Sequence, residues 1–230
     1  MPLMLRSILL LAGEVELPRL ATVLRDYNPA LEVVPVPSVA DLPPPEAALL
    51  RQARIVAFVF PEIVPGTVLR AAAFGAYNLH PGPPAYPGWA PACWAAYDGA
   101  ARFGATLHAM VERVDAGPIV ATEEFDVPSG THARTLEELA YAAAVRLFWR
   151  MAPDLATRSE PLPAGPWQWS GPRRTRRHYA AMCELSADIA EAELIRRLRG
   201  FGYGDDGAPR PAVTLFGHRF RWQEPSGEGA

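Results

Sequence analysis

"RIVAFVFPEIVPGTVLRAAAFGAYNLH", residues 54–80, decides the fold class of this chain. Residues 54–60 form an apolar, β-branched run, which is typical of a strand covered on both faces. Residues 65–72 then have the spacing of a helix, and residues 75–80 predict the next strand. Strands that alternate with helices predict a parallel sheet, so we expect a doubly wound α/β domain.

The same alternation extends on both sides of this stretch. We expect further strands at 7–12 and 31–36, two strands within 102–127, and further helices at 16–27, 45–53, 91–100 and 135–152. Thr135, which is followed by two glutamates, is the expected cap of the last helix. The fold class is therefore α/β, with a mostly parallel, doubly wound, Rossmann-like sheet.

A change in composition after residue 152 marks the end of this domain. Residues 152–177 are rich in Pro, Gly and Arg, which indicates a linker or extended arm. A helix at 186–201 and a hairpin at 211–222, with Gly217 and His218 at its turn, follow. We predict a main domain at 1–152, a linker at 153–177 and a small helix-and-hairpin appendage at 178–230. An appendage of ~60 residues is marginal alone, so it should pack against the main domain.

The composition excludes several classes of function. The net charge is −3 and the pI is about 6.0, so nothing marks the whole chain as a nucleic-acid binder. All 22 basic residues are arginine, which excludes a Schiff-base lysine, a P-loop lysine and a lysine general base. The sequence has neither the glycine-rich dinucleotide fingerprint nor the Gly-x-Ser-x-Gly nucleophile elbow.

Cysteine and histidine spacing gives no sign of a metal or a disulfide. Cys93 and Cys183 are far apart and match no zinc or redox spacing, so we expect buried free thiols and a cytoplasmic location. The five histidines have no paired spacing, and no metal is expected. The apolar stretch at 7–13 is too short to span a membrane and has no cleavage site after it, so we expect neither a membrane partner nor a signal peptide.

Asn78 and His80 stand at the carboxyl end of the predicted strand 75–80. Residues two apart in a strand share a face, and ligands of doubly wound sheets bind beyond the carboxyl ends of strands. An Asn amide can stabilise an oxyanion, and a His can move a proton near neutral pH. Asp115, in the turn between the two strands of 102–127, would orient the imidazole and raise its pKa. Each of these features alone is also typical of a structural pair or an ordinary turn.

The stretch NLHPGPPAYPGWAPACWAAYDGAARFGATLHAMVERVDAGPIV, residues 78–120, resembles the core signature of the folate-dependent formyltransferases. That superfamily includes glycinamide ribonucleotide formyltransferase, methionyl-tRNA formyltransferase and the sugar N-formyltransferases. The matching positions are Asn78, His80, Pro81, Gly88, Pro91, Trp94, Gly104, Thr106, His108, Asp115, Gly117 and Ile119. Matches in this order are specific for the superfamily, though not for the substrate.

The resemblance implies a role for each site residue and a formyltransferase-type Rossmann-like fold. Asn78 would hold the oxyanion of the tetrahedral intermediate, His80 would shuttle protons, and Asp115 would orient His80 and a water. The implied donor is 10-formyltetrahydrofolate. Its pterin pocket would be lined by Phe60, Ile63, Val64, Val111, Val114 and Asp115. Tyr86 and Trp89 lie in the loop that meets the acceptor in this family.

Two departures from the family pattern concern the acceptor and the rim of the pocket. The loop after His80 is one residue shorter than the usual one and has Pro87 where the family has Arg. Pro61 stands where many members have Gly. The acceptor therefore has to be inferred from other features.

We expect a small acceptor with a primary amine, such as an amino sugar or a nucleotide-linked sugar, rather than a tRNA. The tRNA-specific relatives carry a C-terminal domain of ~100 residues, whereas ~60 residues follow the linker here. The basic cluster Arg173, Arg174, Arg176 and Arg177 suits a single phosphate or a nucleotide-linked sugar. Hydrolysis of the formyl-folate, tRNA formylation and non-catalytic folate binding are the alternatives, and a homodimer is left open.

Overall fold

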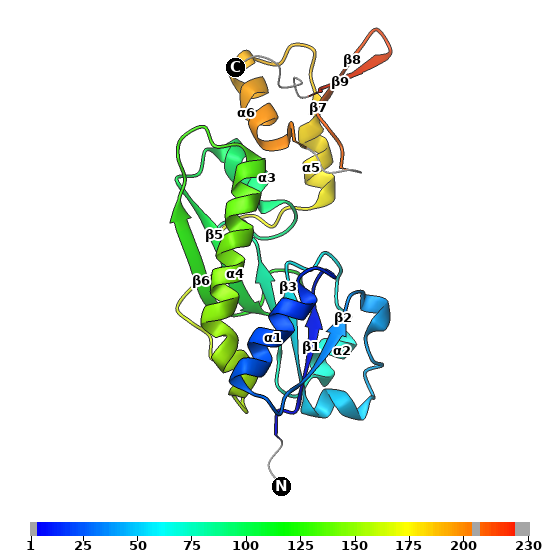
Figure 1. Cartoon of the computed structure of the whole chain (residues 1–230). Helices are drawn as coiled ribbons and strands as arrows, with labels where there is room; N and C mark the ends of the chain where they lie inside the picture. Colours follow the sequence, from blue (N-terminus) through cyan, green and yellow to red (C-terminus); the bar gives the residue numbers. More distant parts are fainter. Residues whose placement is uncertain (1–3, 204–207, 224–230) are drawn as a thin grey trace.

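The computed structural model describes residues 4–203 and 208–223, and its core is one six-stranded sheet (Figure 1). The strand order is β2-β1-β3-β4-β5-β6. The strands are β1 Ser7–Leu11, β2 Glu32–Val36, β3 Ala53–Phe58, β4 Ala76–His80, β5 Arg102–Ala109 and β6 Ile119–Asp126. The first four strands pair in parallel, and β5 and β6 extend the β4 edge in antiparallel orientation. The predicted mostly parallel α/β sheet is confirmed.

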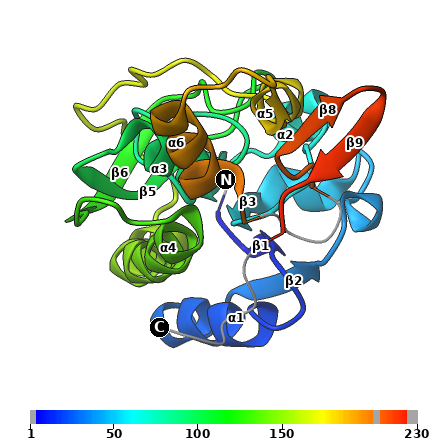
Figure 2. The same cartoon turned by 90° about the horizontal axis from the view of Figure 1, so that it is seen from above.

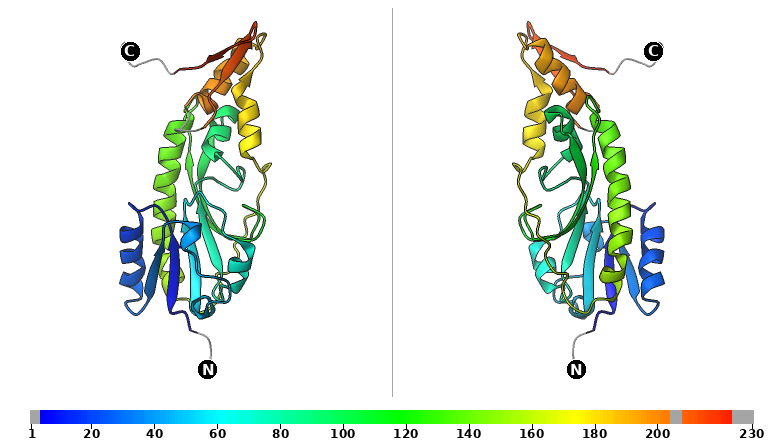
Figure 3. Two further views of the ribbon diagram at one scale, coloured as in Figure 1. Left: turned by 90° about the vertical axis from the view of Figure 1, so that its right-hand side faces the viewer. Right: turned by 90° about the vertical axis from the view of Figure 1, so that its left-hand side faces the viewer.

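Helices cover both faces of this sheet (Figure 3). One face carries α1 Leu17–Tyr27 and α4 Ala133–Thr157, and the other carries α2 Gly66–Ala71 and the short 3-10 helix η2 Ala48–Gln52. The residues of β1 alternate between the two cores: Ile8 and Leu10 face α1 and α4, whereas Leu9 and Leu11 face the other side. All four are fully buried, which is why the strands are apolar throughout.

The C-terminal elements form an appendage at one end of the sheet (Figure 1), and they lie nearest the viewer in Figure 2. They are α5 Arg176–Cys183, β7 Glu184–Leu185, α6 Glu191–Phe201, β8 Ala212–Leu215 and β9 His218–Arg221. Phe201 packs edge-to-face on Trp94 of α3 Pro91–Asp98 and on Tyr179, with ring centroids 5.0 Å apart in both pairs. The appendage therefore packs against the main domain, as expected.

Helix α4 begins earlier and ends later than the sequence predicts. It runs from Ala133 to Thr157, with His132 rather than Thr135 at the N-cap and with Pro153 inside it. The buried guanidinium of Arg54 donates hydrogen bonds to carbonyl oxygens at and beyond the helix end: Asp154, Leu155, Arg158 and Glu160. Asp154 O also accepts the C-cap hydrogen bond from Arg158 N–H. The last carbonyls of a helix have few N–H partners of their own, so Arg54 stabilises the extra turns. Burial lowers the pKa of Arg54 to about 10.

Because of this extension, the predicted boundary at residue 152 falls inside α4. The predicted linker, residues 153–177, contains the end of α4, an extended segment and the first residues of α5. The division into main domain, linker and appendage stays a prediction. The predicted main domain and appendage include residues that lie outside the described ones: 1–3, 204–207 and 224–230.

Three local predictions were wrong. The helix expected at 45–53 is only the 3-10 helix η2, because β3 begins directly after it at Ala53 and leaves no room for a longer helix. Helix α5 was not predicted; Thr175 caps it by accepting a hydrogen bond from His178 N–H. The β8–β9 turn uses Phe216 and Gly217, both with positive φ, and His218 already belongs to β9.

Both cysteines are free and buried, as expected. Burial raises the pKa of the Cys183 thiol to about 12, so this thiol is protonated at neutral pH. None of the helices in the described part of the chain is long and apolar enough to cross a membrane.

Candidate active site

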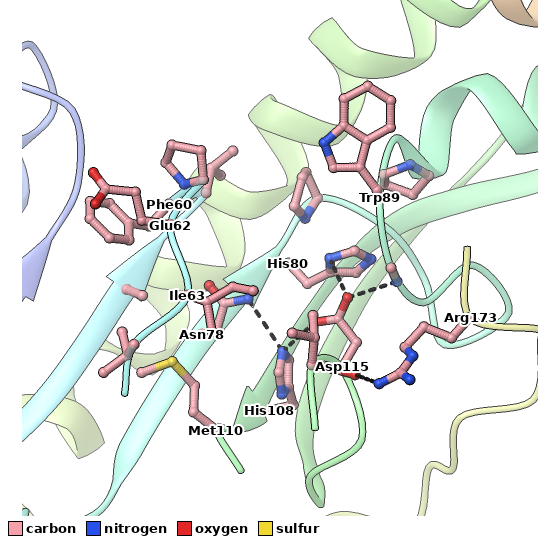
Figure 4. Close-up of a pocket in the computed structure, with 18 of the residues that line it drawn as sticks. Phe60, Glu62, Ile63, Asn78, His80, Trp89, His108, Met110, Asp115 and Arg173 are labelled. Carbon is pink, nitrogen blue, oxygen red and sulfur yellow. Dashed lines mark hydrogen bonds and ion pairs between the residues drawn. The ribbon is translucent and has the colours of Figure 1, made fainter. Parts of the chain in front are cut away.

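A cavity of about 800 Å³ lies at the carboxyl ends of β3 and β4 (Figure 4). Ligands of doubly wound sheets bind at this edge, because the loops that follow the strands converge there. Two groups of side chains line the cavity. We call Asn78, His80, His108 and Asp115 the polar cluster, and Phe60, Ile63, Val64, Val111 and Val114 the apolar wall.

The pairing of β4 with β5 positions three members of the polar cluster. Asn78 and His80 both line the cavity from β4. In the antiparallel register with β5, Asn78 lies opposite His108, and His80 lies opposite Thr106. Asn78 Nδ2 is 3.3 Å from His108 Nε2. The sheet therefore brings together two polar side chains that are 30 residues apart in the sequence.

Asp115 joins the cluster from the turn between β5 and β6, and its side chain is buried. One carboxylate oxygen accepts a hydrogen bond from Gly88 N–H at 2.7 Å and lies 3.5 Å from His80 Nδ1; the other lies 3.2 Å from His108 Nε2. Burial alone would raise the pKa of Asp115, but the two histidines and the Gly88 N–H outweigh burial and lower it to about 2. Asp115 is therefore ionised at neutral pH.

One ring nitrogen of His80 donates a hydrogen bond to the backbone, and the other can accept a proton. Nε2 lies 3.0 Å from the carbonyl oxygen of Tyr86, which can only accept a hydrogen bond, so Nε2 carries a proton. Nδ1 faces Asp115 and can take up a second proton. Burial lowers the pKa of His80, and the opposing effects of Asp115 and the Tyr86 carbonyl do not reverse this.

The expectation that Asp115 raises the pKa of His80 above its usual value is wrong. The imidazolium would lose its hydration in this closed position, and that loss outweighs the attraction of one carboxylate. His80 is therefore a neutral base at neutral pH, with an ionised carboxylate beside it.

Asn78 has one polar atom without a protein partner. Its Oδ1 is buried and accepts no hydrogen bond from the residues that the structure describes. Both ring nitrogens of His108 face oxygen acceptors, Ala109 O at 2.9 Å and Asp115 Oδ1 at 3.2 Å. Turning the Asn78 carboxamide by a half-rotation would give His108 an oxygen and leave the amide N–H for a ligand. An N–H donor at this position can stabilise an oxyanion.

All residues predicted for the pterin pocket line the cavity. Ile63, Val111 and Val114 are exposed there, although they are large hydrophobic side chains. Phe60 and Val64 belong to the same wall, which comes from the loop after β3 and the loop after β5. An exposed apolar wall beside a few convergent polar groups is typical of a site for a flat organic ligand.

The two predicted acceptor residues lie in different places. Trp89 lines the cavity. Tyr86 is absent from the lining residues; its ring packs edge-to-face on Phe103, and its backbone carbonyl holds His80. Burial raises the pKa of the Tyr86 hydroxyl to about 12, helped by a hydrogen bond to Asp98. Tyr86 therefore supports the site from behind, because the short loop after His80 turns its ring toward the core.

Residues 163–176, which we call the strap, close one side of the site. Trp89 N–H donates to Arg174 O and Arg174 N–H donates to Pro87 O, each at 3.0 Å. Gly88 between them has a φ of 97°, and a Cβ there would lie 2.2 Å from Arg174 O. Only glycine fits this close approach. The strap thus fixes the N–H group that binds Asp115.

The strap also brings arginines to the cavity. Arg173, Arg174 and Arg176 line it, whereas Arg177 does not. The guanidinium of Arg174 lies over the Trp94 ring at 4.2 Å, and that of Arg176 over the Trp89 ring at 5.6 Å. Arg173 donates to Val114 O at 3.4 Å. These contacts hold three positive charges on the same side of the cavity (Arg173 is seen in Figure 4).

Neither a role for His108 nor the packing of the strap against the loop after His80 was predicted from the sequence. His108 stands in the quoted motif on the same strand face as Thr106, so pairing of the two predicted strands could have located it. No local pattern indicates the place of the strap, because it is held by residues that are roughly 50 to 90 positions away in the sequence. No group of three or more His, Cys, Asp or Glu that could hold a metal ion occurs within 4–203 and 208–223.

Comparison with known proteins agrees with this geometry. Residues 46–150 match the family model described as formyl transferase, and Asn78, His80 and Asp115 all lie within them. This part of the chain is therefore similar to formyl transferases, and the whole polar cluster lies within it.

Solved formyltransferases share the fold. A sugar N-formyltransferase from a Shewanella species matches with a TM-score of 0.74 at 16% identity, over 94% of this chain and 96% of that one. A methionyl-tRNA formyltransferase from Clostridium thermocellum matches with 0.64 at 18%, over 97% and 94%. The formyltransferase PseJ from Anoxybacillus kamchatkensis, solved with UDP-4,6-dideoxy-4-formamido-L-AltNAc and tetrahydrofolate, matches with 0.58 at 22%, over 84% and 98%. At these identities the likeness shows the fold alone.

Proposed function

We propose that this protein transfers a formyl group from 10-formyltetrahydrofolate to the primary amine of a small acceptor. The observation that carries the proposal is the arrangement of Asn78 with the buried side chains of His80 and Asp115 beside a cavity with an apolar wall. The formyl transferase match of residues 46–150 supports this chemistry.

In the proposed reaction, the acceptor amine attacks the formyl carbon on N10 of the folate. Asn78, with its amide N–H turned toward the cavity, stabilises the oxyanion that forms. His80, neutral because it is buried, takes the proton of the attacking amine and returns it to N10 as the carbon–nitrogen bond breaks. The ionised Asp115 orients the ring and a water, and it stabilises the imidazolium between the two proton transfers.

The apolar wall is the proposed site of the pterin. Ile63, Val111 and Val114 leave apolar surface uncovered in the cavity, and a flat ring system would bury it. Backbone groups of the same loops can satisfy the amide-like edge of a pterin. The presence of tetrahydrofolate in the PseJ structure is consistent with a folate donor.

The three arginines of the strap suggest an acceptor that carries phosphate. No carboxylate within 4.0 Å pairs with Arg173, Arg174 or Arg176 among the described residues. Guanidinium groups that are free of carboxylates suit phosphate oxygens. We therefore propose a nucleotide-linked amino sugar. The PseJ structure holds a UDP-linked sugar whose 4-position carries a formamido group, which is the formylated form of such an acceptor.

The length of the chain does not support a sugar acceptor over a tRNA acceptor. The match covers 94% of the methionyl-tRNA formyltransferase from Clostridium thermocellum, so a short chain does not separate a tRNA acceptor from a sugar. The acceptor proposal rests on the cavity and on the local charge.

The test is an assay of tetrahydrofolate release. The protein is incubated with 10-formyltetrahydrofolate alone, with nucleotide-linked amino sugars, and with methionyl-tRNA, and the acceptor is examined by mass spectrometry. We expect release only with an amino sugar, together with its formylated product, and no release from the His80→Ala variant.

Each other outcome favours a specific alternative. Release without any amine means hydrolysis of the donor. Formylated methionyl-tRNA without a sugar product means that the acceptor is a tRNA. Folate binding with no release under any condition means that the protein binds folate without catalysis.

A further inference from the structure

One tryptophan of the strap contacts both histidines of the polar cluster. The ring of Trp169 lies edge-to-face on His108, with centroids 5.1 Å apart, and on His80, with centroids 5.8 Å apart. Trp169 does not line the cavity, whereas both histidines do. The indole therefore covers the two imidazoles on the side that faces away from the cavity, and both histidines are almost completely buried.

The position of Trp169 is fixed from both sides along the strap. Its Nε1–H donates to Gly117 O at 2.8 Å, in the turn that carries Asp115. Before it, Gly165 N–H donates to Ile119 O at 2.8 Å; after it, Ser170 N–H donates to Pro84 O at 3.0 Å. These bonds tie the indole to β6 and to the loop after His80. The indole cannot turn aside without losing its bond to Gly117, and the two backbone bonds hold the strap on either side of it.

We propose that Trp169 is a positioning residue, which holds the imidazoles of His80 and His108 toward Asp115 and keeps water from their rear side. It needs no contact with the substrate for this. Its catalytic consequence rests on the proposed function, but its effect on the histidines does not.

The consequence for His80 follows from its surroundings. The charged or titratable groups that act on its ring are Asp115 from the turn after β5 and His108 from β5, and Arg173 and Arg174 from the strap line the same cavity. All of them remain when Trp169 is replaced. Burial is the largest cause of the lowered pKa of His80. Water admitted at the rear of the ring would hydrate the imidazolium and raise that pKa.

The experiment is a titration of the histidine ring signals by NMR in the substrate-free protein. It compares Trp169→Ala with Trp169→Phe and with Trp167→Ala. Trp167 is the matched control, because it lies on the same strap, is 40% exposed and rests against Gly165. Circular dichroism reports whether each variant is folded.

We expect the pKa of His80 to rise in Trp169→Ala toward the ordinary value of ~6.5. Trp169→Phe keeps an apolar ring at the same position, so most of the depression should remain. Trp167→Ala should titrate as the unaltered protein does. If Trp169→Ala does not fold, Trp169→Leu replaces it, and an intermediate rise is expected there.

A folded Trp169→Ala, or its Leu substitute, with an unchanged His80 titration overturns the proposal. An equal change in Trp167→Ala also overturns it, because the effect would then belong to the strap in general. If formyl transfer is absent but the titration moves as expected, the proposed function fails and this inference stands.

Where transfer is present, kcat supplies a second readout. Its acidic limb should move to higher pH in Trp169→Ala, because His80 must be neutral to accept a proton. The KM for the amine should stay the same, since Trp169 does not line the cavity. A raised KM with an unmoved limb would contradict the positioning role.

Discussion

The polar cluster is buried and interlocked, whereas the apolar wall of the same cavity is open. His80, His108 and Asp115 are 4%, 2% and 8% exposed, and each is held by hydrogen bonds or ion pairs. Ile63 and Val111 are 71% and 42% exposed. Groups fixed in advance favour chemistry, because no reorganisation is needed when charge develops. Exposed apolar surface favours binding, because a ligand can remove it from water.

If this division is correct, the largest effects come from the polar cluster. Asn78→Ala should lower kcat by ~10²-fold or more, since one oxyanion donor contributes about 3 kcal/mol. His80→Ala should be at least as severe, and KM should change little in either variant. Steady-state kinetics on folded protein measure this, with His178→Ala on the surface of α5 as the control. Near-normal turnover in both variants would remove them from the mechanism.

Asp115→Asn tests the polar cluster through the pH dependence of kcat. The carboxylate raises the pKa of His80 against the larger effect of burial. Without it, that pKa falls further, so the acidic limb of kcat should move to lower pH. At neutral pH kcat should also fall, because the imidazolium that forms between the two proton transfers loses the carboxylate beside it. A limb that stays in place would mean that Asp115 only shapes its turn.

On the apolar wall, Ile63→Ala should weaken binding without slowing the chemical step. Removing most of a side chain that a ligand buries costs about 1–2 kcal/mol, which is roughly a tenfold rise in the Kd for tetrahydrofolate. Titration by fluorescence or calorimetry measures it. Ile195→Ala on α6, also an exposed isoleucine, is the matched control. A fall in kcat with unchanged folate binding would break the division between wall and cluster.

Replacing arginines of the strap should have the smallest effect of these substitutions. Replacing Arg173 and Arg176 by Gln should raise the KM of a nucleotide-linked acceptor about fivefold, because exposed charge pairs contribute little each. Arg177→Gln, in the same run but outside the cavity lining, should change nothing. The rise should shrink in high salt. Equal effects of both replacements would point to a general surface charge rather than an acceptor site.

Much of the fold was predictable because it depends on local patterns. The run at 54–60 and its neighbours gave the parallel strands, since an apolar, β-branched run needs cover on both faces. The helix expected at 91–100 is α3, and Gly99 ends it with a φ of 68°, as glycine commonly does at a helix C-terminus. The length of α4 was not predictable, because its last turn depends on Arg54, about 100 residues earlier in the chain.

The sequence by itself determined a large part of the set of side chains that reach the site. Asn78 and His80 share a strand end, Asp115 follows in a tight turn, and Ile63 and Val111 lie in the adjoining loops. Only the tertiary structure decided how these groups behave. It buried His80 enough to lower its pKa, turned Tyr86 toward the core, placed His108 beside Asn78 and laid Trp169 behind both histidines. The reason is physical: periodicity and turn chemistry act between near neighbours, whereas burial and desolvation are set by segments that meet only in the folded chain.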